Sequence, residues 1–222
     1  GDGTYGAATV RGNLVAQLNP SVSTAAGCVD KAPNANIAAG SNIFTVVPAT
    51  VDVCANFFED GYVYFNDDDG EGLLFRIKSN TAADVSASQV MTIETWDPTP
   101  IAITTSSAMT IIRNPYDRVG PATDLAEYVV GVAPLTGTVS TAPATDLTAA
   151  SATATSYFQW LQTWGPAAVL QTDSSARGAQ MTSHTTDGAV AISGASTSNT
   201  IGTQISLGVS TEYRAIDLRI RP

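Results

Sequence analysis

The sequence predicts an all-β fold of two small β-sandwich or barrel domains, with extended Thr/Ala/Ser-rich arms and little helix. Three observations predict it. Apolar and polar residues alternate at a period of two in several short runs, and no stretch has a long apolar stripe at a period of 3.6. Clusters of Gly, Pro, Asn and Asp separate the runs, as is typical of sandwiches and barrels.

Five short runs carry the strand prediction, and each is rich in β-branched or aromatic residues: GYVYF at 61–65, LLFRIKS at 73–79, VMTIETW at 90–96, AMTIIRN at 108–114 and YRAIDLRI at 213–220. The last run places three apolar residues on one face and three charged residues on the other: Ile216, Leu218 and Ile220 against Asp217, Arg219 and Arg221. It therefore predicts a half-buried strand.

The stretch NPYDRVGPATD at 114–124 contains two prolines and a glycine between two strand-rich halves, so we place a boundary there. Low-complexity Thr/Ala/Ser segments at 136–156 and near 21–41 predict extended arms, with a short helix after Asp146 as an alternative. We expect an N-terminal arm with the first strands at 1–55 and a first β domain at 56–115. A linker with an extended loop would follow at 116–156, and a second β region at 157–222 that could be continuous with the linker.

The composition argues against several classes of protein. Apolar residues make up 44% of the 222 residues and charged residues 14%, unlike a disordered chain. The formal net charge is −10 and the ten basic residues are scattered, so we expect no nucleic-acid partner. No apolar run approaches the ~18 residues of a membrane helix, so we expect no membrane partner.

The acidic segment FNDDDGEG at 65–72 could be a calcium loop or a hairpin tip. An EF-hand loop has Gly at its sixth position and a bidentate Glu at its twelfth. With Gly70 at the sixth position the twelfth is Arg76, and with Gly72 it is Lys78. Asp-Gly between alternating runs is typical of a hairpin turn. We therefore predict a hairpin tip, with a weak cation site as the alternative, at Asp67, Asp68, Asp69 and Gly70.

No arrangement of residues predicts catalysis, a metal site or a cofactor. Cys28 and Cys54 lack the further ligands of a zinc site, and a disulfide between them stays open. The one histidine, His184, precedes an Asp-Gly turn, and the chain has no G-x-S-x-G elbow, P-loop or dinucleotide fingerprint. We expect that the chain is not an enzyme.

The segment YFQWLQTWGPAAVL at 157–170 mixes aromatic, apolar and amide side chains on both faces of a strand. Such a surface suits protein–protein contacts, whereas core packing is the commoner role of a single aromatic residue, so both roles stay open. Proline cannot donate to a ladder, so we expect Gly165 and Pro166 to end or bend this strand. The candidate interface residues are Tyr157, Phe158, Trp160, Leu161, Trp164, Gly165 and Pro166.

The order of motifs across residues 56–222 resembles structural proteins of tailed bacteriophages, above all the head decoration (cement) proteins predicted in marine phage genomes. The motifs are DGYVYFNDDDGEGLLFRIKSN, MTIETWDPTPIAITTSSAMTIIRNPY, YFQWLQTWGPAAVL, the Ile201-Gly202 segment and the charged terminal run. The resemblance implies a non-catalytic protein that binds and stabilises the outer surface of an icosahedral capsid. Its partners would be the major capsid protein and neighbouring copies, as a homotrimer.

Two alternatives remain at this stage. The first is another phage structural role, such as a head-fibre base or a tail-associated protein. The second is a secreted β-sandwich adhesin or carbohydrate-binding module, in which Trp160 and Trp164 would form the platform and the acidic loop a cation site.

Overall fold

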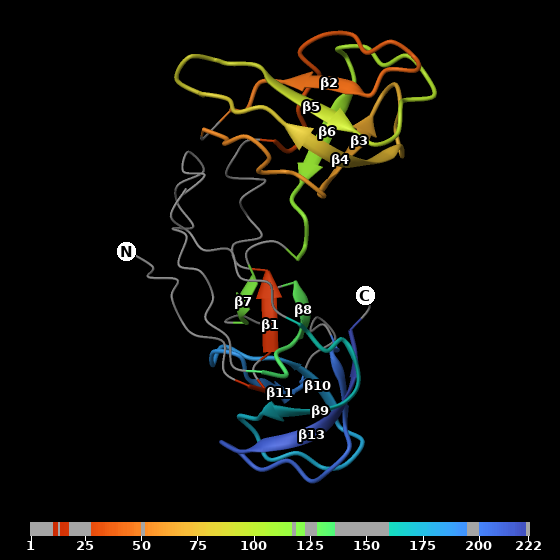
Figure 1. Cartoon of the computed structure of the whole chain (residues 1–222). Coiled ribbons are helices and arrows are strands. Elements are labelled where there is room, and N and C mark those ends of the chain that lie inside the picture. Colours follow the sequence, from red (N-terminus) through yellow and green to blue (C-terminus); the bar gives the residue numbers. More distant parts are fainter. Residues whose placement is uncertain are drawn as a thin grey trace. The chain divides into compact units, whose positions relative to one another are not determined.

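The computed structural model describes residues 11–12, 14–17, 28–49, 52–116, 119–122, 128–135, 160–194 and 200–220. Within these ranges the chain is all β, with thirteen strands in three antiparallel sheets and no helix, which confirms the predicted fold class (Figure 1). The described ranges accordingly hold no helix that could cross a membrane. The predictions for Tyr157, Phe158 and the 136–156 arm concern residues outside these ranges.

The strands are β1 (Leu14–Gln17), β2 (Ile43–Val46), β3 (Tyr62–Asp67), β4 (Leu74–Asn80), β5 (Met91–Thr95), β6 (Ala108–Ile112), β7 (Val119–Pro121), β8 (Val129–Val132), β9 (Trp164–Leu170), β10 (Gln180–Ser183), β11 (Val190–Ile192), β12 (Gly202–Gln204) and β13 (Tyr213–Arg219). The runs predicted at 61–65, 73–79, 90–96, 108–114 and 213–220 correspond to β3, β4, β5, β6 and β13.

The strands belong to two compact units, which we call the inserted unit (β2–β6) and the host unit (β1 and β7–β13). The inserted unit lies in the chain between β1 and β7, so the host unit is built from two separate stretches of sequence. The first 55 residues contribute to both units, because β1 pairs with β7 and β8 whereas β2 pairs with β5.

The inserted unit is one five-stranded sheet in the order β2-β5-β4-β3-β6. The segment at 31–34 hydrogen-bonds to both edge strands. Lys31 and Met109 of β6 exchange two backbone hydrogen bonds of 2.8 Å, and the Asn34 amide donates to the Thr45 carbonyl of β2 at 2.7 Å. The described part of the expected N-terminal arm therefore packs on its own unit and protects both sheet edges.

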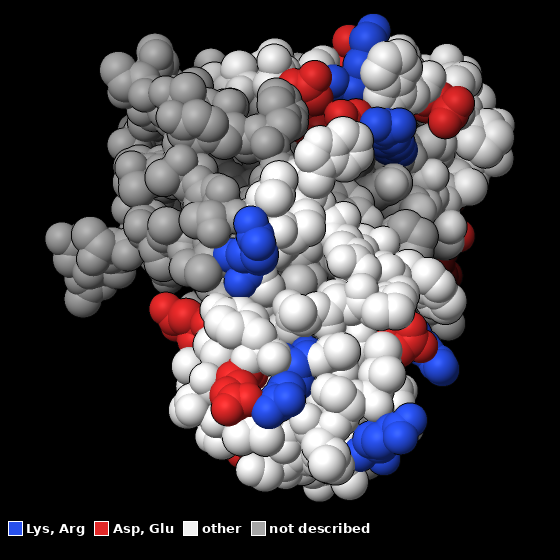
Figure 2. Space-filling view, turned by 60° about the horizontal axis from the view of Figure 1, so that its bottom comes forward, with Lys and Arg blue, Asp and Glu red and all other residues white. Residues whose placement is uncertain are grey.

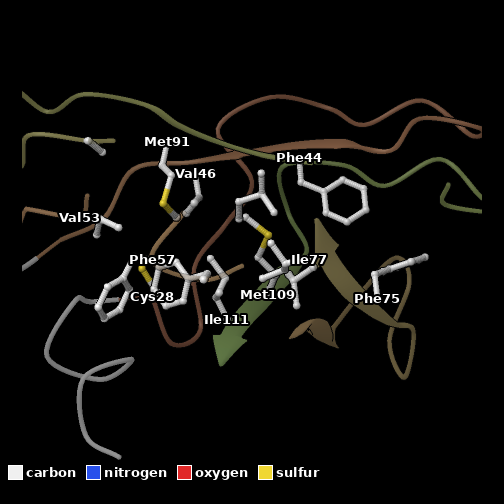
Figure 3. Close-up of a cluster of buried hydrophobic side chains, with 14 of the residues drawn as sticks. Cys28, Phe44, Val46, Val53, Phe57, Phe75, Ile77, Met91, Met109 and Ile111 are labelled. Carbon is white, nitrogen blue, oxygen red and sulfur yellow. The ribbon is translucent and has the colours of Figure 1, made fainter. Parts of the chain in front are cut away.

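The core of the inserted unit centres on three phenylalanine rings in edge-to-face contact. Phe44 of β2 lies 5.7 Å from Phe65 of β3 and 5.4 Å from Phe75 of β4, measured between ring centroids. All three side chains are buried, and Cys28 and Met109 belong to the same cluster (Figure 3). The buried apolar residues of β2, β3 and β4 occupy alternate positions of their strands, so the positions between them face outward.

The host unit contains a five-stranded sheet in the order β11-β10-β12-β13-β9 and a three-stranded sheet in the order β7-β1-β8. Strand β1 is buried on both faces. Leu14 and Ala16 join a core cluster with Ile216 and Leu218 of β13, whereas Val15 joins a second cluster around Val130. The alternation predicted for the last strand is confirmed, since Ile216, Leu218 and Ile220 are buried.

Candidate functional site

Of the candidate interface residues, Trp164, Gly165 and Pro166 lie in β9, an edge strand of the five-stranded sheet. Gly165 and Pro166 do not end the strand, because it starts at Trp164 and continues through Leu170, but Gly165 has a φ of 79°, which departs from the extended conformation of a regular strand. Ile220 donates its amide to the carbonyl of Thr163 at 3.1 Å. In an antiparallel ladder only every second residue of a strand hydrogen-bonds to a given neighbouring strand. Thr163 bonds to Ile220, so Pro166, three positions later, has its backbone N and O directed away from β13, and its missing donor disrupts no bond there.

Gln162 covers the free edge of β9. Its side-chain amide donates to the carbonyl oxygens of Trp164 at 3.0 Å and of Pro166 at 2.9 Å. Its backbone exchanges two hydrogen bonds with Val132 of β8, at 2.8 and 2.9 Å. The proline thus removes one edge donor and the glutamine satisfies two edge acceptors, which disfavours pairing with another strand.

The outward face of β9 and its neighbours is largely apolar, and we call it the Trp164 face. Trp164 is 68% exposed and Tyr213 is 46% exposed. In register, Ala168 of β9 lies opposite Ala215 of β13, and the amide of Ile205 donates to the carbonyl of Ala215 at 3.0 Å. The face consists of Trp164, Pro166, Ala168, Ile205, Tyr213 and Ala215, and the ion-paired Asp217 and Arg219 lie on it directly opposite Pro166 and Trp164.

The other described members of the motif are placed differently. Trp160 is 85% exposed, so a core role is wrong for both Trp160 and Trp164. Leu161 is partly buried and packs against the cluster around Val130. A Cβ on Gly131 would lie 2.8 Å from the Cβ of Leu161, so glycine permits this close approach of the 160–163 segment to β8.

Asp67, Asp68, Asp69 and Gly70 lie at the connection of the β3–β4 hairpin. Asp68 and Gly70 have φ values of 56° and 85°, the left-handed conformation that Asp and Gly tolerate in turns. One Asp69 carboxylate oxygen accepts a hydrogen bond from Thr104 Oγ1 at 2.8 Å. Among the residues that the structure describes, no three His, Cys, Asp or Glu side chains gather to hold a metal ion.

The cysteines and the histidine have local, structural surroundings. Cys28 and Cys54 are buried and not disulfide-bonded to each other. Burial raises the pKa of the Cys28 thiol to about 12, with a smaller opposing effect from Lys31. His184 Nδ1 accepts a hydrogen bond from the Thr186 amide at 3.0 Å within its own turn.

A second exposed surface, which sequence analysis did not identify, lies on the outward face of the inserted unit. Tyr62 of β3 is directly opposite Arg76 of β4, and the Trp96 amide donates to the Arg76 carbonyl at 3.1 Å. Trp96 is 57% exposed. We call this surface the Trp96 face; it consists of Tyr62, Tyr64, Leu74, Arg76, Lys78, Glu94 and Trp96. The alternating runs at 61–65, 73–79 and 90–96 contain these residues, but only the strand register places them together.

The charges on the Trp96 face are paired. Arg76 contacts Asp60 at 2.8 Å, and Lys78 contacts Glu94 at 2.7 Å while its Nζ lies 5.7 Å from the centre of the Trp96 ring. The hydrogen bond from Lys78 lowers the pKa of Glu94. Figure 2 shows acidic and basic side chains next to one another in small groups on a largely uncharged described surface, and this view contains no extended basic patch.

Comparison with protein-family models, with curated proteins and with solved structures found no match. The described residues thus present an all-β protein with two exposed aromatic sheet faces, one in each unit. We infer the function from the chemistry of these faces.

Proposed function

We propose that the chain is a non-catalytic structural protein of a tailed-phage virion, which binds the outer surface of the icosahedral capsid and stabilises it as a decoration, or cement, protein. The Trp164 face is the observation on which this proposal depends. Its β9 residues, Trp164, Pro166 and Ala168, lie within a motif that resembles the phage proteins, and the face presents exposed Trp and Tyr side chains of the kind that anchor protein–protein interfaces.

The capped edge of β9 favours contact through the face of the sheet over contact through its edge. Gln162 and Pro166 leave few free backbone groups on this edge, so strand addition by a partner is disfavoured. The outward side chains remain available, because Trp164, Pro166 and Ala168 are exposed. A partner with a complementary apolar surface would bury them beside the Asp217–Arg219 pair, which lies opposite Pro166 and Trp164.

The charge of the chain is compatible with the outside of a capsid. At a formal net charge of −10 the protein would be repelled by packaged nucleic acid and would stay soluble at high copy number. Decoration needs no chemistry: each copy that bridges capsid subunits adds its binding free energy to the assembled state. We propose that the partners are the major capsid protein and adjacent copies in a homotrimer.

Sedimentation with capsids tests the proposal. Capsids of the encoding phage that lack the protein are mixed with the purified chain, and the bound copies are counted after pelleting. We expect stoichiometric binding, strong loss with Trp164→Ala, and retention with Trp96→Ala, a matched exposed tryptophan in the other unit. Imaging of intact virions provides the second test. A location in the tail or inside the head would contradict the proposal, as would full binding by Trp164→Ala.

A further inference from the structure

The Trp96 face has a regular row of side chains that runs across three strands. Tyr62, Arg76 and Trp96 follow one another on β3, β4 and the end of β5, through the Tyr62–Arg76 pairing and the backbone hydrogen bond from Trp96 to Arg76. Adjacent strands are about 4.8 Å apart, so the backbones of the two aromatic residues are separated by about 10 Å. Arg76 is the residue between them, and its guanidinium is held by Asp60. Tyr64 and Leu74 form a second, parallel row because they are also directly opposite each other.

The polar groups of this face are held in place by one another. Asp60 accepts from Arg76, and Glu94 accepts from Lys78 at 2.7 Å and from Ser79 at 3.4 Å. Lys78 also lies over Trp96. Donors and acceptors that are fixed before a ligand binds lose little conformational entropy on binding, which favours recognition.

These ion pairs make the face a poor centre for a protein–protein interface. Burying Arg76–Asp60 and Lys78–Glu94 under an apolar partner would remove four charged groups from water, and the Coulombic attraction often fails to offset that desolvation. The centres of protein interfaces are accordingly depleted in charged residues. The Trp164 face is less charged, because among the described residues it holds one ion pair, Asp217–Arg219, against two on the Trp96 face.

A ligand with many hydroxyl groups avoids this desolvation. Each hydroxyl both donates and accepts hydrogen bonds, so it can contact a guanidinium or ammonium and a carboxylate in the same site. The flat apolar face of a pyranose ring can lie on an aromatic ring such as Trp96, more than half of which is exposed. The alternation of rings and charged groups along the row therefore matches a chain of sugars.

The charge of the face indicates which glycans it would accept. Two cations and two anions form its two pairs, so the face is locally neutral in a chain of net charge −10. Acidic polysaccharides would be repelled by the molecule as a whole. We propose that the Trp96 face is a binding site for neutral polysaccharide chains, with Trp96 and Tyr62 as stacking platforms and Arg76, Lys78 and Glu94 as hydrogen-bonding groups.

Titration with defined sugars tests this site. The full chain is titrated by calorimetry with a panel of neutral hexasaccharides of glucose, mannose, galactose and N-acetylglucosamine, and with a uronic-acid hexasaccharide of similar size. We expect at least one neutral probe to bind and the acidic probe to bind more weakly. Trp96→Ala should weaken binding about tenfold or more, as loss of an aromatic anchor does. Trp164→Ala, the matched variant in the host unit, should bind as the wild type does.

Further variants separate loss of the site from loss of the fold. Tyr62→Phe keeps the ring and should retain most of the affinity, whereas Arg76→Ala should reduce it without lowering the melting temperature greatly. The proposal is overturned if no neutral probe binds, if the acidic probe binds best, or if Trp96→Ala leaves binding unchanged. Failure to bind sugars combined with loss of capsid binding in Trp96→Ala would assign this face to a protein partner instead.

Discussion

The side-chain amide of Gln162 donates to the carbonyl oxygen of Pro166, four residues along the chain, at 2.9 Å on the free edge of β9. The same amide also reaches the carbonyl of Trp164 at 3.0 Å. Both carbonyls point away from β13, toward the side of β9 on which a further strand could pair. The edge is thus closed while the neighbouring apolar face stays open, and this combination directs contact to the side chains.

Substitution of Gln162 tests the closed edge. Gln162→Ala removes both donors, so we expect a loss of about 1 kcal/mol in the free energy of unfolding, the typical net contribution of an intramolecular hydrogen bond. We also expect more self-association at high concentration, because the two carbonyls become free acceptors. Chemical denaturation and light scattering measure the two effects. Gln180→Ala, at an exposed glutamine of β10 whose side chain accepts one hydrogen bond from Thr200, should lower stability by less and should not change self-association.

Gly202 tests the close packing of β12 against β13. A Cβ at this position would lie directly against the backbone carbonyl of Asp217, which cannot move without disturbing the ladder. We expect Gly202→Ala to lower stability by about 1–3 kcal/mol or more, as overpacking does. Gly194→Ala is the control, since no described atom lies within 4 Å of the point that its Cβ would occupy and its φ is not positive. Equal melting temperatures for the two variants would contradict the close approach.

The sequence predicted those strands whose own alternation is strong, and it failed where tertiary pairing decides. Runs such as YRAIDLRI carry their face assignment in the side chains, and β13 follows it. The segments LVAQ of β1 and VVGV of β8 carry no such signal, because β1 is buried on both faces and Gly131 of β8 is required by a neighbour. Pro166 misled the prediction because a proline is compatible with a strand whose N–H side faces outward, and only the pairing reveals that side.

The two faces differ in how far sequence could predict them. Trp160 and Trp164 stood out as a cluster within one short segment, and their exposure agrees with a contact role. The row of Tyr62, Arg76 and Trp96 combines residues from three separate runs. Its recognition requires the register of β3, β4 and β5, which no single run contains.

The phenylalanine cluster predicts that the inserted unit depends on its own core. Phe44→Ala removes a buried ring that contacts both Phe65 and Phe75, so we expect a loss of about 3–5 kcal/mol in the free energy of unfolding of this unit. The fluorescence of Trp96, the one tryptophan of the inserted unit, reports the unfolding of this unit in a background in which Trp160 and Trp164 are replaced by Phe. Ile216→Ala, in the host-unit core, should leave the Trp96 transition nearly unchanged. A large shift of that transition by Ile216→Ala would contradict independent cores.

The thiol of Cys28 predicts resistance to alkylation. Burial disfavours the charged thiolate and raises the pKa to about 12, so at about pH 8 almost none of the reactive form is present in the folded protein. We expect a thiol reagent to modify neither Cys28 nor Cys54 on mixing, and to modify both after denaturation without reductant, since the two are not joined by a disulfide. Rapid modification of Cys28 in the native protein, read by peptide mass spectrometry, would be the contrary result.

Glu94 predicts how the stability of the inserted unit responds to acid. The hydrogen bond and charge of Lys78 lower its pKa in the folded protein from the ordinary value of 4.5, while the unfolded chain keeps that value. The unfolded state therefore binds the proton first as the pH falls, so the contribution of Glu94 is fully present above about 4.5 and is lost as the pH falls through the lower, folded pKa. Glu94→Gln should thus reduce the melting temperature slightly at neutral pH and by less in acid.

Because the Lys78–Glu94 pair is exposed, high salt should also shrink the difference in melting temperature between Glu94→Gln and the wild type. Glu71→Gln, at an exposed glutamate in the β3–β4 connection, removes one negative charge without breaking the Lys78 pair, so it is the control and should change the melting temperature less at neutral pH. A Glu94→Gln effect that grew as the pH fell would mean that the carboxylate is destabilised in the folded state, contrary to its contact with Lys78.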